Sequence, residues 1–189
     1  MSECIGINTD RLLLRSIRPD DAAALFKYHS DAVINKYQGW IPKTIDDVYD
    51  FIENRISPTI DLINTWYQFG IILKENFEFI GDVGIHFLDE HKKQVEIGCT
   101  LDINYQGKGF ATEALIRIIN YVFLDLDKNV VVTYIDPENI KSIALVERIG
   151  FKKEAHFKES NSIKREWPDD IVYSIIKEDW IAKRLLSQS

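Results

Sequence analysis

Three consecutive stretches in the middle of the chain alternate apolar and polar residues with the period of two that half-buried β-strands show. They run from Trp66 to Leu73, from Phe79 to Leu88 and from Gln94 to Leu101. The connections between them, residues 74–76 and 89–93, are short and charged. Because connections of that length suit β-hairpins, the pattern predicts three antiparallel strands side by side.

The period changes to that of a helix after residue 110. Apolar side chains then recur at alternating steps of three and one, which places them on one helix face, at Ala111, Ala114, Leu115, Ile118, Ile119, Val122, Phe123 and Leu126. Further on, Val130 to Ile135 reads as a buried strand, and Ile140 to Ile149 as a helix that Gly150 ends. Phe151 to Phe157 and Ile171 to Ile176 are predicted to close the sheet as an antiparallel pair.

Two helices are predicted before the three strands. Pro19, followed by two aspartates, suits the first turn of the first helix. Thr44 is a good N-cap for the second, with Asp47 three positions on, and Ser57-Pro58 ends it. Together these elements predict an α/β fold, with a mixed sheet of about seven strands and helices packed on both of its faces.

Composition favours one domain over residues 1–189, because 189 residues of which 46% are apolar can build one sizeable core. The formal charge of −7 argues against nucleic acid as a partner, since that would need clustered Lys and Arg. The apolar runs are far shorter than the ~20 residues of a membrane span, and the first residues lack the basic and apolar regions of a signal peptide. We therefore expect a cytoplasmic protein that does not contact membranes.

Metal chemistry is not indicated either. Cys4 and Cys99 are too few and too far apart for a disulfide framework or a cysteine-rich metal site, and Cys99 is expected to be a small core residue. The histidines lack the spacing of paired ligands. They are His29, His86, His91 and His156.

The segment from Ile103 to Leu115 joins a strand to the amphipathic helix through a turn with few side chains. Gly107 and Gly109 permit positive φ and close approach of a ligand, and the N–H groups that begin the helix attract anionic oxygens. A P-loop is excluded because Gly107-Lys108 is followed by glycine instead of Ser or Thr. A dinucleotide-binding fingerprint is excluded because its sixth position is Thr112.

The form Gln106-x-x-Gly109-x-Ala111 instead resembles the acyl-CoA-binding motif of the GNAT superfamily of N-acyltransferases. Residues 9–15 look like the opening strand of the branch that includes the ribosomal-protein N-terminal acetyltransferases, and residues 96–101 like its strand before the CoA turn. Residues 139–151 are similar to its next helix and the turn after it. The resemblance spans nearly the whole chain and implies a GNAT-like, mostly antiparallel sheet.

The resemblance implies acetyl transfer from acetyl-CoA, as acyl donor, to an amine, without a metal. It assigns the donor site to the CoA turn and its flanks, which comprise Leu101, Ile103, Gln106, Gly107, Lys108, Gly109, Phe110, Ala111, Thr112, Asn139 and Ser142. In the family, a backbone N–H near the end of the strand, here Leu101 to Ile103, stabilises the oxyanion. Lys108 and Lys141 could reach the CoA phosphates, although solvated lysines are the ordinary case.

A base must take a proton from the ammonium group before the amine can attack. Glu96 is the first candidate, because its place in the strand is similar to that of the family's acidic residue. The alternative is an exposed or cross-strand paired glutamate. His86, in the neighbouring strand, is the second candidate, against a structural or exposed histidine.

Asn139 and Ser142 match the family's Asn-x-x-Ser. The resemblance places Asn139 near the pantetheine arm and gives Ser142 the possible role of donating a proton to the thiolate. Asn139 is also a strong N-cap for the helix that begins at Ile140. Both roles can hold together.

The acceptor site is expected where such enzymes differ, at residues 37–42 and 160–170. Tyr37, Trp40 and Trp167 offer cation–π surface to an ammonium group, and Asp169 or Asp170 offers negative charge. The aromatic side chains would otherwise cover the core.

Three functions remain open. The first is acetylation of a peptide or protein N-terminal α-amine, and the second is the same reaction on a small amine such as a polyamine, amino acid or aminoglycoside. The third is CoA binding without turnover. The sequence leaves the acceptor unidentified, and the choice between monomer and homodimer open.

Overall fold

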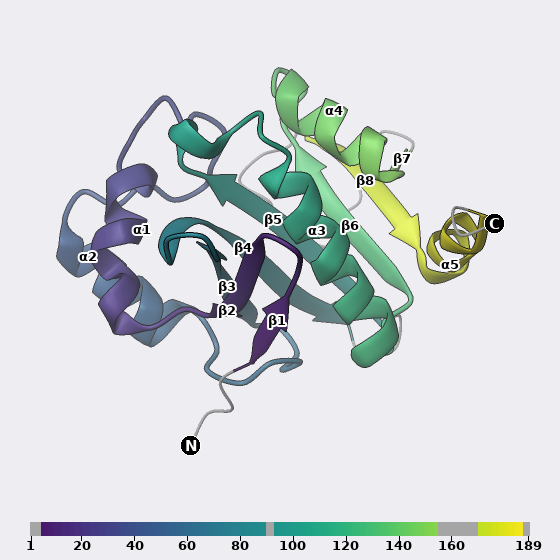
Figure 1. Ribbon diagram of the computed structural model, residues 1–189, viewed down its shortest axis with the longest axis horizontal. Coiled ribbons are helices and arrows are strands. Elements are labelled where there is room, and N and C mark those ends of the chain that lie inside the picture. Colours follow the sequence, from purple (N-terminus) through teal and green to yellow (C-terminus); the bar gives the residue numbers. More distant parts are fainter. Residues whose placement is uncertain (1–4, 90–92, 155–169, 187–189) are drawn as a thin grey trace, which may run out of the picture.

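The computed structural model of the protein describes residues 5–89, 93–154 and 170–186 and centres on one sheet (Figure 1). Neighbouring strands follow the order β1-β2-β3-β4-β5-β6-β8-β7. All neighbours are antiparallel except β5 and β6, which are parallel. The strands are β1 Gly6–Asn8, β2 Leu12–Ser16, β3 Trp66–Leu73, β4 Glu78–Asp89, β5 Gln94–Leu101, β6 Val130–Ile135, β7 Lys152–Lys153 and β8 Ile171–Ile176.

The mixed, mostly antiparallel sheet expected from the sequence is confirmed, with eight described strands instead of about seven. The opening strand expected over residues 9–15 is β2, which begins only at Leu12, and the additional strand is β1, which precedes it and pairs with it as a hairpin. Thr9 closes the turn, because its N–H donates to the Leu12 carbonyl at 2.9 Å and its Oγ1 accepts from the Leu12 N–H at 2.8 Å. At the other end, β7 comprises only Lys152–Lys153, and residues 155–157 of the expected strand lie outside the described residues.

Five α-helices accompany the described strands: α1 Ala22–His29, α2 Ile45–Asp50, α3 Phe110–Asn120, α4 Ile140–Ile149 and α5 Lys177–Leu186. The Thr44 N-cap is confirmed, since its side chain accepts from the Asp47 N–H. The long amphipathic helix is shorter than its apolar pattern indicated, because a π-helical segment, Tyr121–Asp125, follows α3. Helix α5 was not expected. It attaches through Trp180, whose Nε1 donates to Asn120 Oδ1 at 2.9 Å.

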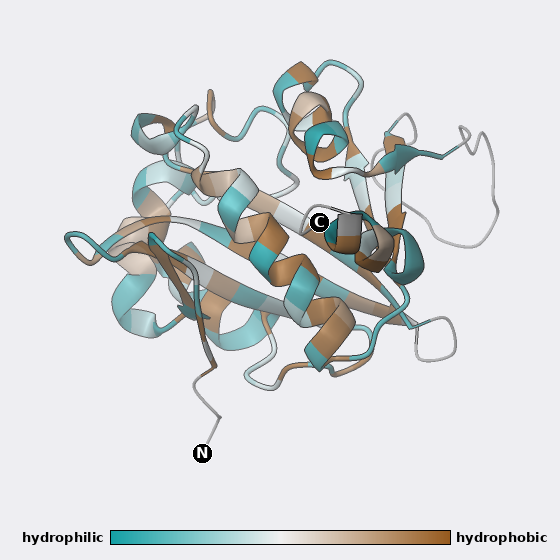
Figure 2. Cartoon of the chain, turned by 45° about the vertical axis from the view of Figure 1, so that its right-hand side comes forward, coloured by the Kyte–Doolittle hydropathy of each residue, from teal (hydrophilic) through white to brown (hydrophobic). Residues whose placement is uncertain are grey.

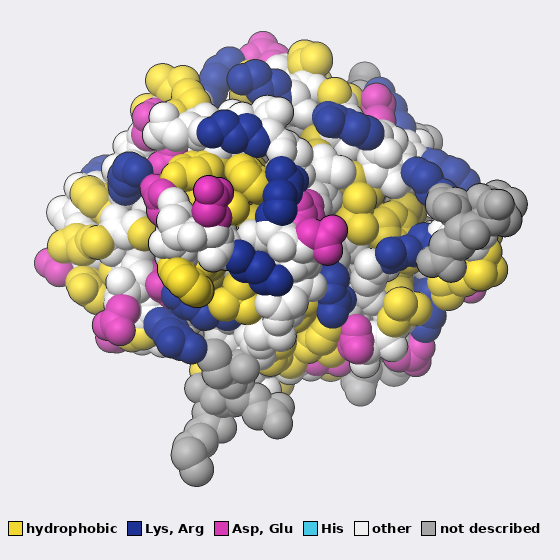
Figure 3. Space-filling view, viewed as in Figure 1, with side chains coloured by type: hydrophobic (Ala, Val, Ile, Leu, Met, Phe, Trp, Pro, Cys, Tyr) yellow, Lys and Arg dark blue, Asp and Glu magenta, His cyan; other side chains and the backbone are white. Residues whose placement is uncertain are grey.

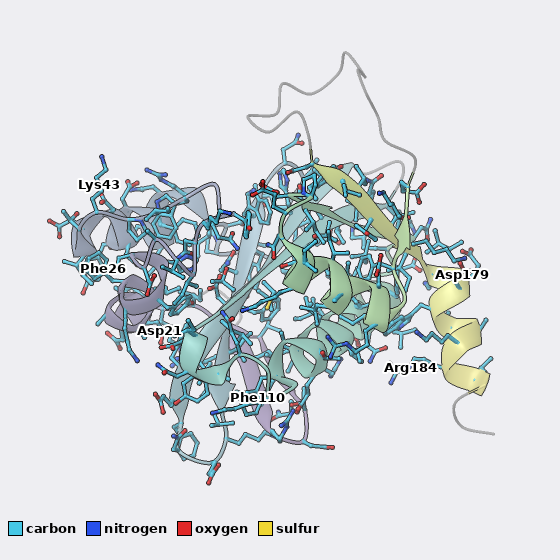
Figure 4. The ribbon with its side chains drawn as sticks, turned by 90° about the horizontal axis from the view of Figure 1, so that it is seen from above. Asp21, Phe26, Lys43, Phe110, Asp179 and Arg184 are labelled. Carbon is cyan, nitrogen blue, oxygen red and sulfur yellow. The ribbon has the colours of Figure 1, made fainter. Side chains whose placement is uncertain are left out.

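Helices cover both faces of the sheet, and alternation along β4 shows why. Val83 and Ile85 point into the main core with the apolar face of α3, visible as its brown bands in Figure 2. Asp82, the residue before Val83, points the other way and accepts a hydrogen bond from Tyr28 of α1. A second apolar cluster joins α1 and α2. Figure 4 accordingly shows Phe110, at the start of α3, well apart from Phe26 and Lys43, which lie with α1 and α2.

Candidate active site

The turn after β5 folds back on the end of that strand. Asp102 caps a short 3₁₀ segment, Ile103–Tyr105, by accepting from the Asn104 N–H at 2.9 Å. Gln106 Nε2 then donates to the Leu101 carbonyl at 3.1 Å. The glutamine of the predicted motif therefore fixes the shape of the turn.

The two glycines of the turn have the conformation that the sequence predicted. Their φ angles are 76° for Gly107 and 83° for Gly109, and Gly109 caps α3 in the left-handed region. Among the described residues, no protein acceptor receives a hydrogen bond from the N–H groups of residues 107–112. Consecutive unpaired N–H groups at the positive end of a helix can bind a diphosphate. The turn therefore fits the phosphate cradle that the motif predicts.

Strands β5 and β6 separate beside this turn. Their parallel pairing runs from Gln94 opposite Val130 to Glu96 opposite Val132 and stops there, whereas β5 continues to Leu101. Because β5 and β6 are parallel, the helices that follow them, α3 and α4, both begin at the edge of the sheet where the two strands separate. The β5 backbone beyond Glu96 is thus left unpaired by β6, which suits a donor arm lying between the strands.

Asn139 caps α4, and Ser142 lies in its first turn. The Asn139 Oδ1 accepts from the backbone N–H of Ser142 at 3.2 Å, so the capping role is present in the structure. No hydrogen bond of the Ser142 hydroxyl to another described residue is formed. That hydroxyl is consequently available to a thiolate without disturbing the cap.

The two candidate bases lie together on the face opposite α3. Glu96 of β5 pairs with His86 of β4, and its Oε2 is 3.5 Å from the His86 Nδ1. Trp66 stacks on the His86 ring, with 4.7 Å between ring centroids. Both side chains of the pair are only about one-fifth exposed, at 19% for Glu96 and 23% for His86. Glu96 is therefore paired across the strands, and it also adjoins the point where β5 and β6 separate.

Gly98 provides open space next to this pair. It lies two residues beyond Glu96 on the same face of β5, where a Cβ atom would meet no atom of the described residues within 4 Å. Opposite it, the space over Gly84 is filled by the side chains of Trp66 and Gln68. An amine could thus enter over Gly98, between the base pair and the polar residues nearer α1.

Those polar residues form a buried network that the sequence did not reveal. Asp82 is 2% exposed and accepts from Tyr28 at 2.5 Å, from His29 Nε2 at 2.9 Å, and from Gln68 Nε2. Burial and the Asp82 carboxylate raise the pKa of Tyr28 well above its usual value, so the phenol stays a donor. An aspartate within an apolar strand was the only sign in the sequence that this network exists.

The expected acceptor residues lie in different surroundings. Tyr37 donates from its hydroxyl to the Glu138 carbonyl at 3.3 Å, which links the segment after α1 to the loop before α4. Trp40 stacks on Phe51, at 4.4 Å between centroids, and covers the second core. Asp170 is half-buried just before β8. Trp167 and Asp169 lie outside the described residues.

A separate cavity of about 400 Å³ opens between β2 and the end of α2. None of the predicted donor or base residues lines it. Its lining is Ser16, Ile17, Arg18, Pro19, Ile52, Glu53, Ile56, Ser57, Pro58, Tyr67 and Gln68.

Positive charge is spread over the face that carries α3, although the chain is acidic overall (Figure 3). Lys108 is exposed in the turn, with Nζ 5.3 Å from the centroid of the Tyr105 ring, and Lys141 is exposed in the first turn of α4. Within the described residues, His, Cys, Asp and Glu form no group of three that could hold a metal ion. None of the described helices is long and apolar enough to cross a membrane.

Residues 11–152 match the family described as acetyltransferase (GNAT) domain. The chain belongs to the GNAT acetyltransferase family. It is an acyltransferase of mixed α/β fold. An uncharacterized N-acetyltransferase, p20, from Bacillus licheniformis is 34% identical over 173 residues, which is 91% of this chain and 96% of that protein.

Two further relatives of this GNAT chain carry named activities. The ribosomal protein uS5-alanine N-acetyltransferase of Escherichia coli (strain K12) is 24% identical over 189 residues, 95% of each chain. The crystal structure of spermidine N-acetyltransferase from Vibrio cholerae, in complex with CoA and spermine, matches with a TM-score of 0.76 at 21% identity. It covers 92% of this chain and 99% of that one. The match to the spermidine N-acetyltransferase structure shows that the two chains share a fold.

Proposed function

We propose that residues 1–189 act as one domain that transfers the acetyl group of acetyl-CoA to the N-terminal α-amine of a peptide or protein. The main support for acetyl-CoA as the donor is the turn from Gly107 to Thr112, which presents unpaired N–H groups where β5 and β6 separate. Asn139, whose side-chain Nδ2 group is not needed for its cap, begins α4 at the same edge. Both features suit the diphosphate and the arm of an acyl-CoA.

The reaction needs a base and a donor for the leaving thiolate. Glu96, directly or through water, takes one proton from the ammonium group, with His86 holding the carboxylate in place. The amine nitrogen then bonds to the acetyl carbon and the carbon–sulfur bond breaks, while backbone N–H groups near Leu101 to Ile103 stabilise the oxyanion. Ser142 gives a proton to the thiolate and regains one, directly or through water, from the nitrogen, which loses its second proton as the amide forms. Each role is an expectation from the family motif with which the geometry is compatible.

Charge at the acceptor side supports an α-amine. An α-amino group titrates near 8 and an alkyl amine near 10, so one carboxylate–imidazole pair suffices for the former. A polyamine carries several ammonium groups and is matched by several carboxylates. Among the described residues around Gly98, Asp82 already accepts three hydrogen bonds, which leaves Glu96 beside His86 as the carboxylate at the opening. The ribosomal-protein activity named for the E. coli relative agrees with this choice.

The test is a turnover assay with acetyl-CoA, read as thiol release and as mass gain of the acceptor. We expect acetylation of a peptide with a free N-terminus and none of the same peptide with a blocked N-terminus and a free lysine. If the protein acetylates spermidine or an aminoglycoside in preference to the peptide, the acceptor is a small amine and not a peptide N-terminus. Binding of CoA without turnover on any acceptor would leave a CoA-binding protein.

A further inference from the structure

The turn of the β1–β2 hairpin grips the first turn of α3. Three donors meet the Glu113 carboxylate: Thr9 Oγ1 and the Arg11 N–H reach Oε1 at 2.6 and 3.0 Å, and Arg11 Nε reaches Oε2 at 2.6 Å. Arg11 and Glu113 are 102 residues apart in the sequence. The grip therefore joins the start of the chain to the element that begins directly after the phosphate cradle.

Arg11 also holds the cradle itself. Its Nη1 donates to the Lys108 carbonyl at 3.1 Å, and its guanidinium lies 4.3 Å from the centroid of the Phe110 ring. The peptide between Lys108 and Gly109 is trans, so its C=O and N–H point in opposite directions. With the carbonyl turned toward Arg11, the Gly109 N–H points away from Arg11, to the side where a ligand can accept from it.

The same contacts settle the charge at this helix end. A carboxylate in the first turn of α3 would repel a bound diphosphate if it were unpaired. Partial burial acts to raise the pKa of Glu113, but the hydrogen bonds from Thr9 and Arg11 outweigh it and hold that pKa below its usual value. Glu113 thus stays ionised and is paired with Arg11, a fork-shaped donor that suits a carboxylate.

We propose that Arg11 is a positioning residue for the diphosphate of the acyl donor: by binding both Glu113 and the Lys108 carbonyl, it orients the Gly109 N–H and the start of α3 toward that group. Arg11 acts from behind the turn, through the backbone. The inference rests on the proposed use of acetyl-CoA. It goes beyond that proposal by making the β1–β2 turn a determinant of donor affinity.

The experiment compares two donors, acetyl-CoA and S-acetylpantetheine, which lacks the diphosphate and the nucleotide. Arg11→Met keeps much of the side chain's length but removes the fork. We expect it to raise KM for acetyl-CoA by roughly 10-fold with kcat nearly unchanged, and to leave kcat/KM for S-acetylpantetheine near wild type. Arg11→Lys, which retains the charge but binds at one point, should recover only part of the loss.

Arg117→Met is the matched control, because Arg117 Nε also ties α3 to the hairpin, at the Asn8 carbonyl (3.3 Å), one helical turn beyond Glu113 and further from the cradle. It should leave KM for acetyl-CoA unchanged. If Arg11→Met proves unstable in a thermal melt, Glu113→Gln, which retains the side-chain shape, takes its place in the test. It should raise KM for acetyl-CoA by a smaller factor and leave the kinetics with S-acetylpantetheine near wild type. Equal losses with both donors, equal losses in the Arg117 control, or no loss in Arg11→Met would overturn the inference. If wild-type protein does not bind CoA in a calorimetric titration, the proposed function fails instead.

Discussion

His86 and Glu96 face each other across β4 and β5, with Nδ1 and Oε2 3.5 Å apart, where β5 separates from β6. The imidazole is itself held by the stacked Trp66. A carboxylate next to an imidazole, half enclosed and beside open space over Gly98, is a suitable acceptor for an ammonium proton. The pair therefore connects the predicted base to a specific position on the sheet.

Glu96→Gln should lower kcat by roughly 100-fold at pH 7 and leave CoA affinity nearly unchanged, because the amide cannot take the proton. The deficit should shrink as pH rises, since more of the amine is then already uncharged. A pH series of rates with calorimetry of CoA binding measures both. Asp50→Asn, which alters an exposed carboxylate at the end of α2 that pairs with Arg55, is the control and should keep its rate. A near-normal rate in Glu96→Gln at pH 7 would assign the proton to His86 or to water.

Gly98→Val tests the open space over β5. The backbone conformation is that of a strand, and among the described parts of the chain a Cβ meets nothing within 4 Å, so a β-branched residue should fit and leave the melting temperature unchanged or slightly raised. It should nevertheless raise KM for the amine by roughly 10-fold, because it fills the space where we place the acceptor. Unaltered acceptor kinetics in a folded variant would move the acceptor site elsewhere.

Gly109→Val should weaken CoA binding by at least ~10-fold. The φ of 83° is costly for a β-branched residue, and the new Cβ would lie 3.4 Å from Arg11 Nη2, so the change acts through the backbone and the Arg11 contact. Gly109→Asn, a residue that tolerates positive φ, should keep more affinity. Calorimetric titration separates them, and equal affinity in all three proteins would remove the cradle interpretation.

Asn139→Ala should lower the stability of the fold, whereas Ser142→Ala should lower the rate of the reaction. The cap uses the Ser142 backbone N–H and the Asn139 side chain, so Asn139→Ala should cost about 1 kcal/mol of stability, whereas Ser142→Ala should not shift the melting temperature. If the Ser142 hydroxyl protonates the thiolate, Ser142→Ala should still lower kcat by ~10-fold. The loss is modest because a thiolate already leaves readily, so its protonation lowers the activation barrier only slightly. Full activity in a stable Ser142→Ala protein would end the acid role.

The Asp127 carboxylate forms ion pairs with Lys93, the residue before β5, and with Lys177, the first residue of α5. The hydrogen bonds from Lys177 and Lys93 lower the pKa of Asp127 to about 2. Because the folded-state pKa is depressed, the contribution to stability is present above about pH 4 and is lost as pH falls toward 2.

Asp127→Asn isolates this charge, since asparagine also tolerates the φ of 51° found there. Melting temperatures at pH 7 should be lower for the variant, and most of the difference should be lost by pH 2, where about half of the carboxylate is protonated. It should also shrink in high salt, because the carboxylate is 66% exposed. A difference that persists at pH 2 would show that the charge is not responsible.

Local periodicity alone determined much of the fold. Strands Trp66–Leu73, Gln94–Leu101 and Val130–Ile135 and helix Ile140–Ile149 have the bounds that their apolar patterns predicted. The glycine turn was equally local, because positive φ is a property of the residue and its neighbours. Periodicity did not predict the β1–β2 hairpin, whose turn depends on the Thr9 hydroxyl closing on Leu12.

Tertiary structure decided which side chains act together. His86 and Glu96 were separate candidates in the sequence, and the register of β4 against β5 makes them a pair. The sequence assigned Arg11 no role of its own, because its partner Glu113 lies 102 residues away and only the packing of α3 across the hairpin brings them into contact. The chain's local patterns thus determine its elements and the conformation of its glycine turn, whereas long-range register and packing determine the charge, orientation and accessibility of the groups around them.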